Sequence, residues 1–275
     1  MRRIFYFLAT NAAIMVVVSI VLQFLPAEYR TQDGQFLVFA VIAGFGGSIV
    51  SLLMSKSMAI RSAGVQLIKE PRNDTERWLL DTVARQARAA GIGMPEVGIF
   101  HTPQMNAFAT GANKNNALVA VSSGLLENMS REEAEAVMGH EVAHVANGDM
   151  VTLTLIQGVV NVFVLFLARA LAMVIDRDGR GFGYHIGFMV GQVVFGFLAS
   201  IVVAYFSRLR EFRADIGGAE YASRQGMIGA LQRLQQGQAG ELPKQLAAFG
   251  INSGLKSLFS THPPLEERIK ALQNR

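Results

Sequence analysis

The residues of this sequence best suited to chemistry form one short run, His140-Glu141-Val142-Ala143-His144. In a helix, residues four apart lie on one face, so the two imidazoles can bind the same metal ion. Glu141 then lies about 100° around the helix from His140, where its carboxylate can accept a proton from an attacking water. A zinc ion would lower the pKa of that water to about 7. The pattern predicts a metal-dependent hydrolytic site, and the alternative is a solvated histidine pair on an exposed helix.

A catalytic zinc site needs a third protein ligand and keeps a fourth position for water. The sequence contains no cysteine, so the third ligand cannot be a thiolate. The metzincin extension is also excluded, because Asn147 and Met150 stand where it requires Gly and His. Glu211 and Asp215 lie four residues apart on one helical face, so Glu211 can bind zinc while Asp215 accepts a ligand histidine's ring N–H. The alternative is a charged face that the neighbouring arginines neutralise.

The polar region that carries the first motif has the signals of helices and short strands. Asn73 or Asp74 can cap a helix that ends near Ala90. Ser130 and Glu133 form a capping box at the start of the helix that contains the motif and ends near 147–148. The other predicted elements are strands at 96–101, 106–111 and 117–122, a hairpin turn at 112–116, and a final helix that begins at Pro263-Pro264.

Apolar residues are concentrated in four blocks, which explains a hydrophobic fraction of 51 % beside only 17 % charged residues. A hydrocarbon core of about 30 Å requires about 20 helical residues, so each block is long enough to span it. For the first block the alternative is a cleaved signal peptide. The third contains Asn161 and Arg169, and the alternative there is a helix packed on the protein or lying partly in the membrane. The blocks are 4–25, 35–55, 151–175 and 186–206.

Basic residues flank the apolar blocks, and the net charge is +4. Four crossings place the clusters around Arg2, Lys56 and Arg208 on one side of the membrane, which predicts that this side is cytoplasmic. No nucleic-acid-binding motif is present, so anchoring at a membrane face explains the basic residues better than nucleic acid does. The predicted organisation is membrane helices at 1–55 and 150–206, and one catalytic domain assembled from 56–149 and 207–275.

Three motifs in this order resemble the HtpX family of bacterial membrane zinc metalloproteases, which are relatives of the CAAX prenyl proteases. They are the run 140–144, the segment Ser207-Arg-Leu-Arg-Glu211-Phe-Arg-Ala-Asp215, and the segment Thr261-His-Pro-Pro-Leu-Glu-Glu-Arg268. The resemblance covers essentially the whole chain. It implies a mainly α fold with a small β-sheet, in which a zincin-like (gluzincin) catalytic domain is fused to about four transmembrane helices.

The same resemblance implies one Zn²⁺ per chain and a role for each site residue. His140, His144 and Glu211 would be the ligands, and Asp215 would support one of the histidines. Glu141, His262 and Arg268 would be catalytic, the last two by stabilising negative charge on the substrate carbonyl; alternatively, His262 caps the last helix and Arg268 pairs with a surface acid. An edge strand would bind the substrate through Asn106, Ala107, Phe108 and Ala109, unless it is an ordinary hairpin strand.

The implied activity is hydrolysis of peptide bonds in membrane proteins or unfolded polypeptides at the cytoplasmic face of a bacterial inner membrane. Such an enzyme would serve membrane protein quality control under stress. Two alternatives stay open. One is a protease that processes prenylated proteins, and the other is a non-catalytic membrane protein with a structural zinc. A structural site is usually closed by a fourth side chain, for which His101 remains a candidate.

Overall fold

The structure, a computed structural model, describes residues 32–176, 181–239 and 260–274. The predicted span at 4–25 lies outside these residues. Two compact units divide the chain: one combines Met1–Ser51 with Thr154–Val203, and the other combines Leu52–Leu153 with Ala204–Arg275. Three long helices continue from one unit into the other.

Those three helices contain the other predicted spans. They are α2 (Gln32–Ser62), α6 (Asp149–Ile175) and α7 (Phe182–Tyr221), and all three are long and apolar enough to cross a membrane. The third apolar block is therefore part of one continuous helix despite its two polar side chains. Helix α7 has 40 residues, which correspond to about 60 Å, twice the thickness of a hydrocarbon core. It extends well past the predicted end of the span at 206 and carries both candidate carboxylates on its final turns.

Helices α2 and α6 approach closely in the first unit. A Cβ atom on Gly44 would meet Cγ2 of Val162 at 2.6 Å, so only glycine fits at this crossing. The amide of Asn161 donates to the Gly44 carbonyl at 3.3 Å and accepts from Gln157 at 2.8 Å. Small residues let helix backbones meet inside membranes, and side-chain amides bridge them there. The polar Asn161 is thus satisfied within an apolar block.

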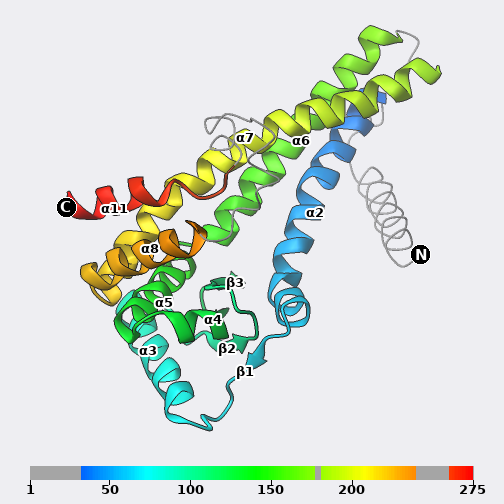
Figure 1. Cartoon of the computed structure of the whole chain (residues 1–275). Coiled ribbons are helices and arrows are strands. Elements are labelled where there is room, and N and C mark those ends of the chain that lie inside the picture. Colours follow the sequence, from blue (N-terminus) through cyan, green and yellow to red (C-terminus); the bar gives the residue numbers. More distant parts are fainter. Residues whose placement is uncertain (1–31, 177–180, 240–259, 275) are drawn as a thin grey trace. The chain divides into compact units, whose positions relative to one another are not determined.

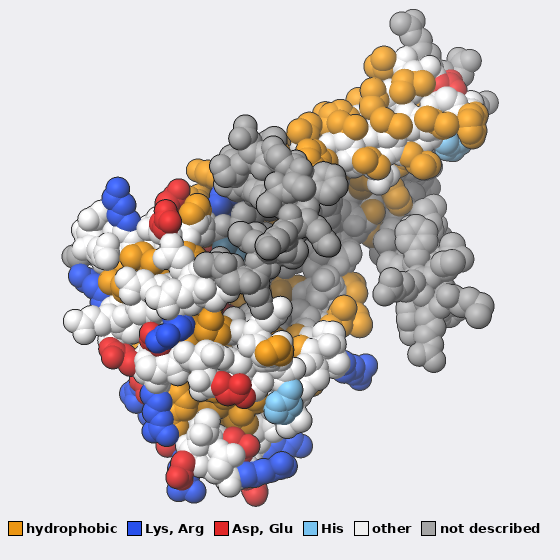
Figure 2. Space-filling model, in the orientation of Figure 1, with side chains coloured by type: hydrophobic (Ala, Val, Ile, Leu, Met, Phe, Trp, Pro, Cys, Tyr) orange, Lys and Arg blue, Asp and Glu red, His pale blue; other side chains and the backbone are white. Residues whose placement is uncertain are grey.

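The surface of the first unit is apolar. Large hydrophobic side chains on α6 and α7 are solvent-exposed in the isolated chain, among them Phe163 (63 %), Val174 (76 %) and Val193 (73 %). Figure 2 shows hydrophobic side chains covering the visible part of these helices, with few charged groups among them. Such a surface on so many turns is expected of helices that face lipid.

The second unit contains a four-stranded sheet of order β1-β2-β4-β3. Strand β2 runs parallel to β4, whereas β3 runs antiparallel to it. The predicted strands are present with shifted ends, and the hairpin turn is tighter than expected because β3 continues through a register irregularity near Gly111 (φ 144°). The strands are β1 (Gln66–Leu67), β2 (Glu96–Phe100), β3 (Ala107–Asn113) and β4 (Asn116–Ser122).

Helix α5 (Arg131–Ala146) is at the centre of this unit (Figure 1) and packs on α3, α8, β3 and β4. Its residues Met138 and Val142 join a core cluster with Leu79 and Val83 of α3 and with three valines of the sheet. The Ser130 capping box is present, so the start of the helix is fixed as predicted. The other helices within the described ranges are α3 (Asp74–Ala90), α4 (Ser123–Asn128), α8 (Arg224–Ala239) and α11 (Leu265–Gln273).

Candidate metal centre

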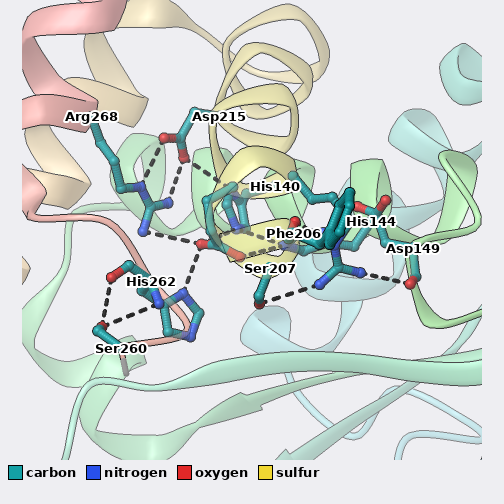
Figure 3. A network of polar contacts seen from close by, with 11 residues as sticks. His140, His144, Asp149, Phe206, Ser207, Asp215, Ser260, His262 and Arg268 are labelled. Atoms are coloured by element: carbon teal, nitrogen blue, oxygen red, sulfur yellow. Dashed lines mark hydrogen bonds and ion pairs between the residues drawn. The ribbon is translucent and has the colours of Figure 1, made fainter. Parts of the chain in front are cut away.

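The side chains of His140, His144 and Glu211 converge within the second unit. Figure 3 shows the two histidines close together, with Asp215 and Asp149 near them. The two Nε2 atoms are 3.1 Å apart, and Glu211 oxygens lie 3.3 Å from Nε2 of His144 and 3.7 Å from Nε2 of His140. Two ligands that bind one zinc ion at 2.0–2.1 Å with tetrahedral angles are separated by about 3.3 Å. The observed separations, and a donor set of two imidazoles and one carboxylate, therefore fit zinc.

Close packing of α7 on α5 brings Glu211 to the histidines. A Cβ atom on Gly217 would meet Cβ of Ala143 at 2.3 Å, and one on Gly218 would meet the carbonyl oxygen of Ala136 at 2.9 Å. The two helix backbones can approach this closely only because residues 217 and 218 are glycines. Since Glu211 is fewer than two turns before this crossing, its carboxylate reaches the face of α5 that carries the imidazoles.

Each ligand histidine has a carboxylate beside its other ring nitrogen. Oδ1 of Asp215 lies 2.9 Å from Nδ1 of His140, although the ring N–H is not well aligned with that oxygen. Nδ1 of His144 lies 2.7 Å from Oδ2 of Asp149. Such carboxylates fix which nitrogen carries the proton and leave Nε2 free to bind a metal. Asp215 thus lies beside His140, and its support of that ring through a hydrogen bond stays a prediction.

Asp149 is a site residue that the sequence motifs did not reveal. It follows Gly148, whose φ of 67° ends α5, and it is the first residue of α6. Its carboxylate is nevertheless buried against His144, and its carbonyl accepts a hydrogen bond of 2.6 Å from Nη1 of Arg210. The sequence signal that could have identified Asp149 was Gly148. A left-handed glycine after the second histidine reverses the chain, so the side chain that follows it points back toward α5.

The electrostatics of the site favour a cation. Burial lowers the pKa of the His144 imidazole, but hydrogen-bonding contacts with Asp149 and Glu211 outweigh burial and raise this pKa to about 10. The negative charge of Glu141 acts in the same direction. Three carboxylates thus surround a ring that is largely buried, which is an environment that stabilises positive charge.

Arg268 is held deeper in the site than an oxyanion-binding role alone would require. It is buried, and its Nε and Nη2 atoms donate to the two oxygens of Asp215 at 2.8 and 2.5 Å. Its Nη1 lies 3.3 Å from Oε2 of Glu211. The guanidinium therefore links both carboxylates of α7, and burial of a bidentate pair makes the arrangement rigid. Its contact with a substrate carbonyl stays a prediction.

His262 is exposed at the rim of the site. Its Nδ1 lies 2.8 Å from Oε2 of Glu211, while 63 % of its side chain is accessible to solvent. The hydroxyl of Ser260 donates to the His262 carbonyl at 2.6 Å and tethers this loop. An exposed imidazole beside a ligand can meet a substrate, which agrees with the predicted role and does not test it.

A cavity of about 560 Å³ opens onto two of the three ligands, His140 and Glu211. Glu141, His262 and Arg268 line it together with His140 and Glu211. The start of the predicted edge strand, Asn106 and Ala107, lines the same cavity, whereas Phe108 packs on Phe100 with ring centroids 5.4 Å apart. The structure therefore places the three predicted catalytic residues and two of the three predicted ligands around one cavity, with His144 behind them, but it packs the Phe108 side chain against the core.

Asp149→Asn should weaken zinc binding about 10- to 100-fold, because an amide is a poorer partner for the ring N–H of His144. Zinc affinity can be measured by competition with a chromogenic chelator. Asp81→Asn, an exposed change on α3, is the matched control and should bind zinc as the parent does. Equal affinities for the Asp149 and Asp81 variants would show that the carboxylate does not support the ligand.

His262→Ala and Arg268→Ala should differ in zinc content. His262→Ala should keep zinc and lower kcat about 10²- to 10³-fold if the imidazole stabilises the oxyanion. Arg268→Ala should lower zinc affinity as well, because Asp215 and Glu211 lose a buried positive partner. Zinc content and kcat, measured for both variants, separate stabilisation of the oxyanion from support of the metal site. A normal zinc content in Arg268→Ala would contradict the role of Arg268 in supporting the metal site.

Known proteins share both the sequence and the fold. The profile of Peptidase family M48 matches residues 73–275. Protease HtpX of Stenotrophomonas maltophilia is 59 % identical over 98 % of this chain and 97 % of its own length, and Protease HtpX of Thioalkalivibrio sulfidiphilus is 57 % identical over 99 % of both chains.

Among solved structures, S. mikatae Ste24p has the same fold, with a TM-score of 0.68 and 18 % identity. The structural match covers 96 % of this chain and 63 % of the Ste24p chain. The sequence similarity covers nearly the full length, and His140, His144 and Glu211 have the geometry of a zinc site. The chain therefore belongs to peptidase family M48 and is a membrane zinc metalloprotease related to protease HtpX.

Proposed function

We propose that the protein is an endopeptidase that cleaves membrane proteins with a catalytic domain assembled from 56–149 and 207–275. The observation that carries the proposal is the cavity that opens onto His140 and Glu211 and has Glu141 in its wall. A structural zinc would be closed by a fourth side chain. Within the described ranges, the candidate ligand group consists of two histidines and Glu211 and does not include His101.

The chain's own residues supply the proton transfers. Zinc held by His140, His144 and Glu211 would polarise the scissile carbonyl. It would also lower the pKa of a bound water to about 7. The Glu141 carboxylate accepts the proton of the attacking water and delivers it to the leaving amine. Asp149 and Asp215 keep both imidazole rings in the orientation that directs Nε2 at the metal.

Strand β3 offers a free edge to an extended substrate. It is one of the two edge strands of the sheet that the structure describes, and β1 is the other. Asn106 points its backbone toward β4, because its carbonyl accepts from the Ser122 N–H at 2.9 Å and its N–H donates to the Ser122 hydroxyl. Backbone direction alternates along an antiparallel strand, so Ala107 and Ala109 direct their N–H and C=O groups away from β4. These two residues can pair with a substrate main chain.

Ala109→Pro should raise KM for long peptides several-fold, because proline removes an outward-facing donor without taking a hydrogen bond from β4. Ala109→Ser keeps the donor and serves as the control. Steady-state cleavage of an unstructured peptide by both variants provides the measurement. Kinetics of Ala109→Pro equal to those of Ala109→Ser would remove this edge from substrate binding.

The chain positions of the ligands support cleavage near the cytoplasmic interface. Helix α5 with its cap ends at Asn147, and only Gly148 separates it from α6, which contains an apolar span. Glu211 is five residues, about 7.5 Å along α7, beyond Phe206, where the other apolar span ends. Basic residues near these helix ends favour the cytoplasmic side of a bacterial inner membrane. Substrates are then cut in cytoplasmic loops. Mapped cuts that cluster within transmembrane segments would contradict this orientation.

Unfolded or damaged membrane proteins are the substrates that fit an edge strand best, since only an extended chain can pair with it. The role that we propose for the enzyme is therefore membrane protein quality control. The test is cleavage of an unmodified, destabilised membrane protein by the purified chain in detergent, with zinc and with a chelator. Zinc-dependent cleavage supports the proposal. Cleavage restricted to prenylated peptides would favour the prenyl-processing alternative, and no cleavage by zinc-loaded protein would favour a structural metal.

A further inference from the structure

The hydroxyl of Ser122 has all of its hydrogen-bonding capacity engaged. Ser122 is the last residue of β4, and its side chain is fully buried. The hydroxyl donates to the Gln104 carbonyl at 2.7 Å. It accepts from the N–H of Asn106 at 2.9 Å and from the N–H of Leu125 at 3.0 Å. A serine hydroxyl has one proton to donate and can accept two, so this one is saturated by three different segments of backbone.

The same hydroxyl takes the place of a backbone group where β3 begins. In an antiparallel ladder, two opposed residues exchange both of their N–H and C=O groups. The Ser122 N–H donates to the Asn106 carbonyl at 2.9 Å, but the Asn106 N–H donates to the Ser122 hydroxyl. Ser122 is also the N-cap of α4, so the chain turns into that helix at this residue. Its side chain thus extends the pairing by one residue beyond the regular ladder, which ends at Ala107 and Val121.

The segment that this hydroxyl holds forms part of the cavity wall. Met105, Asn106 and Ala107 all line the cavity at the metal ligands. Since Gln104 and Asn106 are the two neighbours of Met105, one hydroxyl fixes the chain on both sides of that residue. Ser122 itself is buried behind this wall, so it acts through the wall and does not touch a substrate.

We infer that Ser122 is a positioning residue for substrate binding, because its hydroxyl holds residues 104–107 where an extended substrate would pair with β3. The inference rests on the proposed peptidase function and on the use of the β3 edge. Residues 101–106 lead into β3 and belong to no helix or strand, so hydrogen bonds from outside a regular ladder must hold them. An edge that is already held in one conformation loses less entropy when a substrate binds to it.

Loss of this hydroxyl should affect substrate binding more than the chemical step. Without it, the Gln104 carbonyl and the Asn106 N–H lose their shared partner, and the start of β3 can take up other conformations. The metal ligands and Glu141 belong to α5 and α7, and the start of α5 is fixed by its own capping box. The reacting groups therefore keep their positions. A change that weakens the binding of substrate and transition state equally raises KM and leaves kcat unchanged.

The test compares Ser122→Ala with the parent, both as full-length, zinc-loaded protein in detergent, in steady-state cleavage of a long unstructured peptide. We expect KM to rise about three- to tenfold, with kcat and zinc content as in the parent. Ser122→Thr keeps a hydroxyl and should restore the low KM. Ser123→Ala is the matched control, because the Ser123 hydroxyl also bonds a backbone carbonyl and N–H, those of Thr102 at 3.0 and 3.3 Å. Thr102 is not among the described residues that line the cavity, so this change should leave KM unaltered.

Ser122→Cys decides the matter if Ser122→Ala fails to fold or to retain zinc. A thiol occupies the same place but is a weak donor and a weak acceptor, so it should raise KM by a smaller factor. A zinc-loaded alanine or cysteine variant with the parent's KM overturns the inference and leaves the peptidase function intact. A fall in kcat at unchanged KM, or equal rises of KM in Ser122→Ala and Ser123→Ala, would show that the hydroxyl only stabilises the fold. No cleavage by the zinc-loaded parent would instead remove the proposed function itself, and this inference with it.

Discussion

Glu141→Gln is expected to bind zinc as the parent does and to lose peptide cleavage by about 10²- to 10⁴-fold, the contribution of a general base. Glutamine preserves the shape of the side chain and its place in the cavity wall, and the three ligands are unchanged. Only the ability to accept a proton is lost. Zinc content by elemental analysis and kcat on an unstructured peptide are the two measurements.

The matched control for this change is Glu127→Gln, an exposed substitution on α4 that should leave zinc content and kcat unaltered. A Glu141→Gln protein that retains cleavage at a rate near the parent's would mean that another group accepts the proton. Loss of zinc together with activity would mean instead that Glu141 contributes to metal binding, which its position beside the ligands does not predict.

Glu211→Ala is expected to lose zinc and, with it, all cleavage. The variant leaves two imidazoles as the only protein ligands, one fewer than a catalytic zinc site requires. It also removes a buried carboxylate that contacts His144, His262 and Arg268, so positive charge in the site loses its main counterpart. Elemental analysis after dialysis and cleavage with added zinc provide the measurements.

Glu220→Ala on the same helix is the control, because its side chain is exposed and lies beyond the site. It should retain one zinc per chain and the parent's activity. If Glu211→Ala also retained one zinc per chain, the third ligand would have to be another residue. Partial retention that disappears at lower total zinc would still agree with the assignment, because two histidines bind the metal weakly.

Local signals in the sequence were sufficient for the parts of this protein that depend on near neighbours. Side chains three residues away satisfy the first N–H groups of α3 and α5, so Asn73 and Ser130 marked both helix starts. The two histidines were paired by helix periodicity. Apolar length predicted the three helices that could span a membrane, since a bilayer sets that length directly.

Short elements had no comparable signal. Strand β1 has two residues and α4 has six, so neither shows a period, and both exist because the sheet and the Ser122 hydroxyl stabilise them. The apolar pattern did not give the end of α7 either. The change from apolar to charged residues after Phe206 suggested a boundary, but it marks a change of surroundings along one continuous helix.

The contacts that complete the site were decided by the tertiary structure. Spacing in the sequence put Glu211 and Asp215 on one helical face and suggested a role for each. The crossing of α7 over α5 at Gly217 and Gly218 then places Glu211 at the Nε2 atoms and Asp215 at the other ring nitrogen of His140. Asp149 entered the site through a reversal at Gly148, and Arg268 through packing 53 residues beyond its partner. The sequence by itself determined which residues can do the chemistry, because that follows from residue type and helical period. Which oxygen meets which nitrogen depends on how close two helix backbones come, and only the packed structure decides that distance.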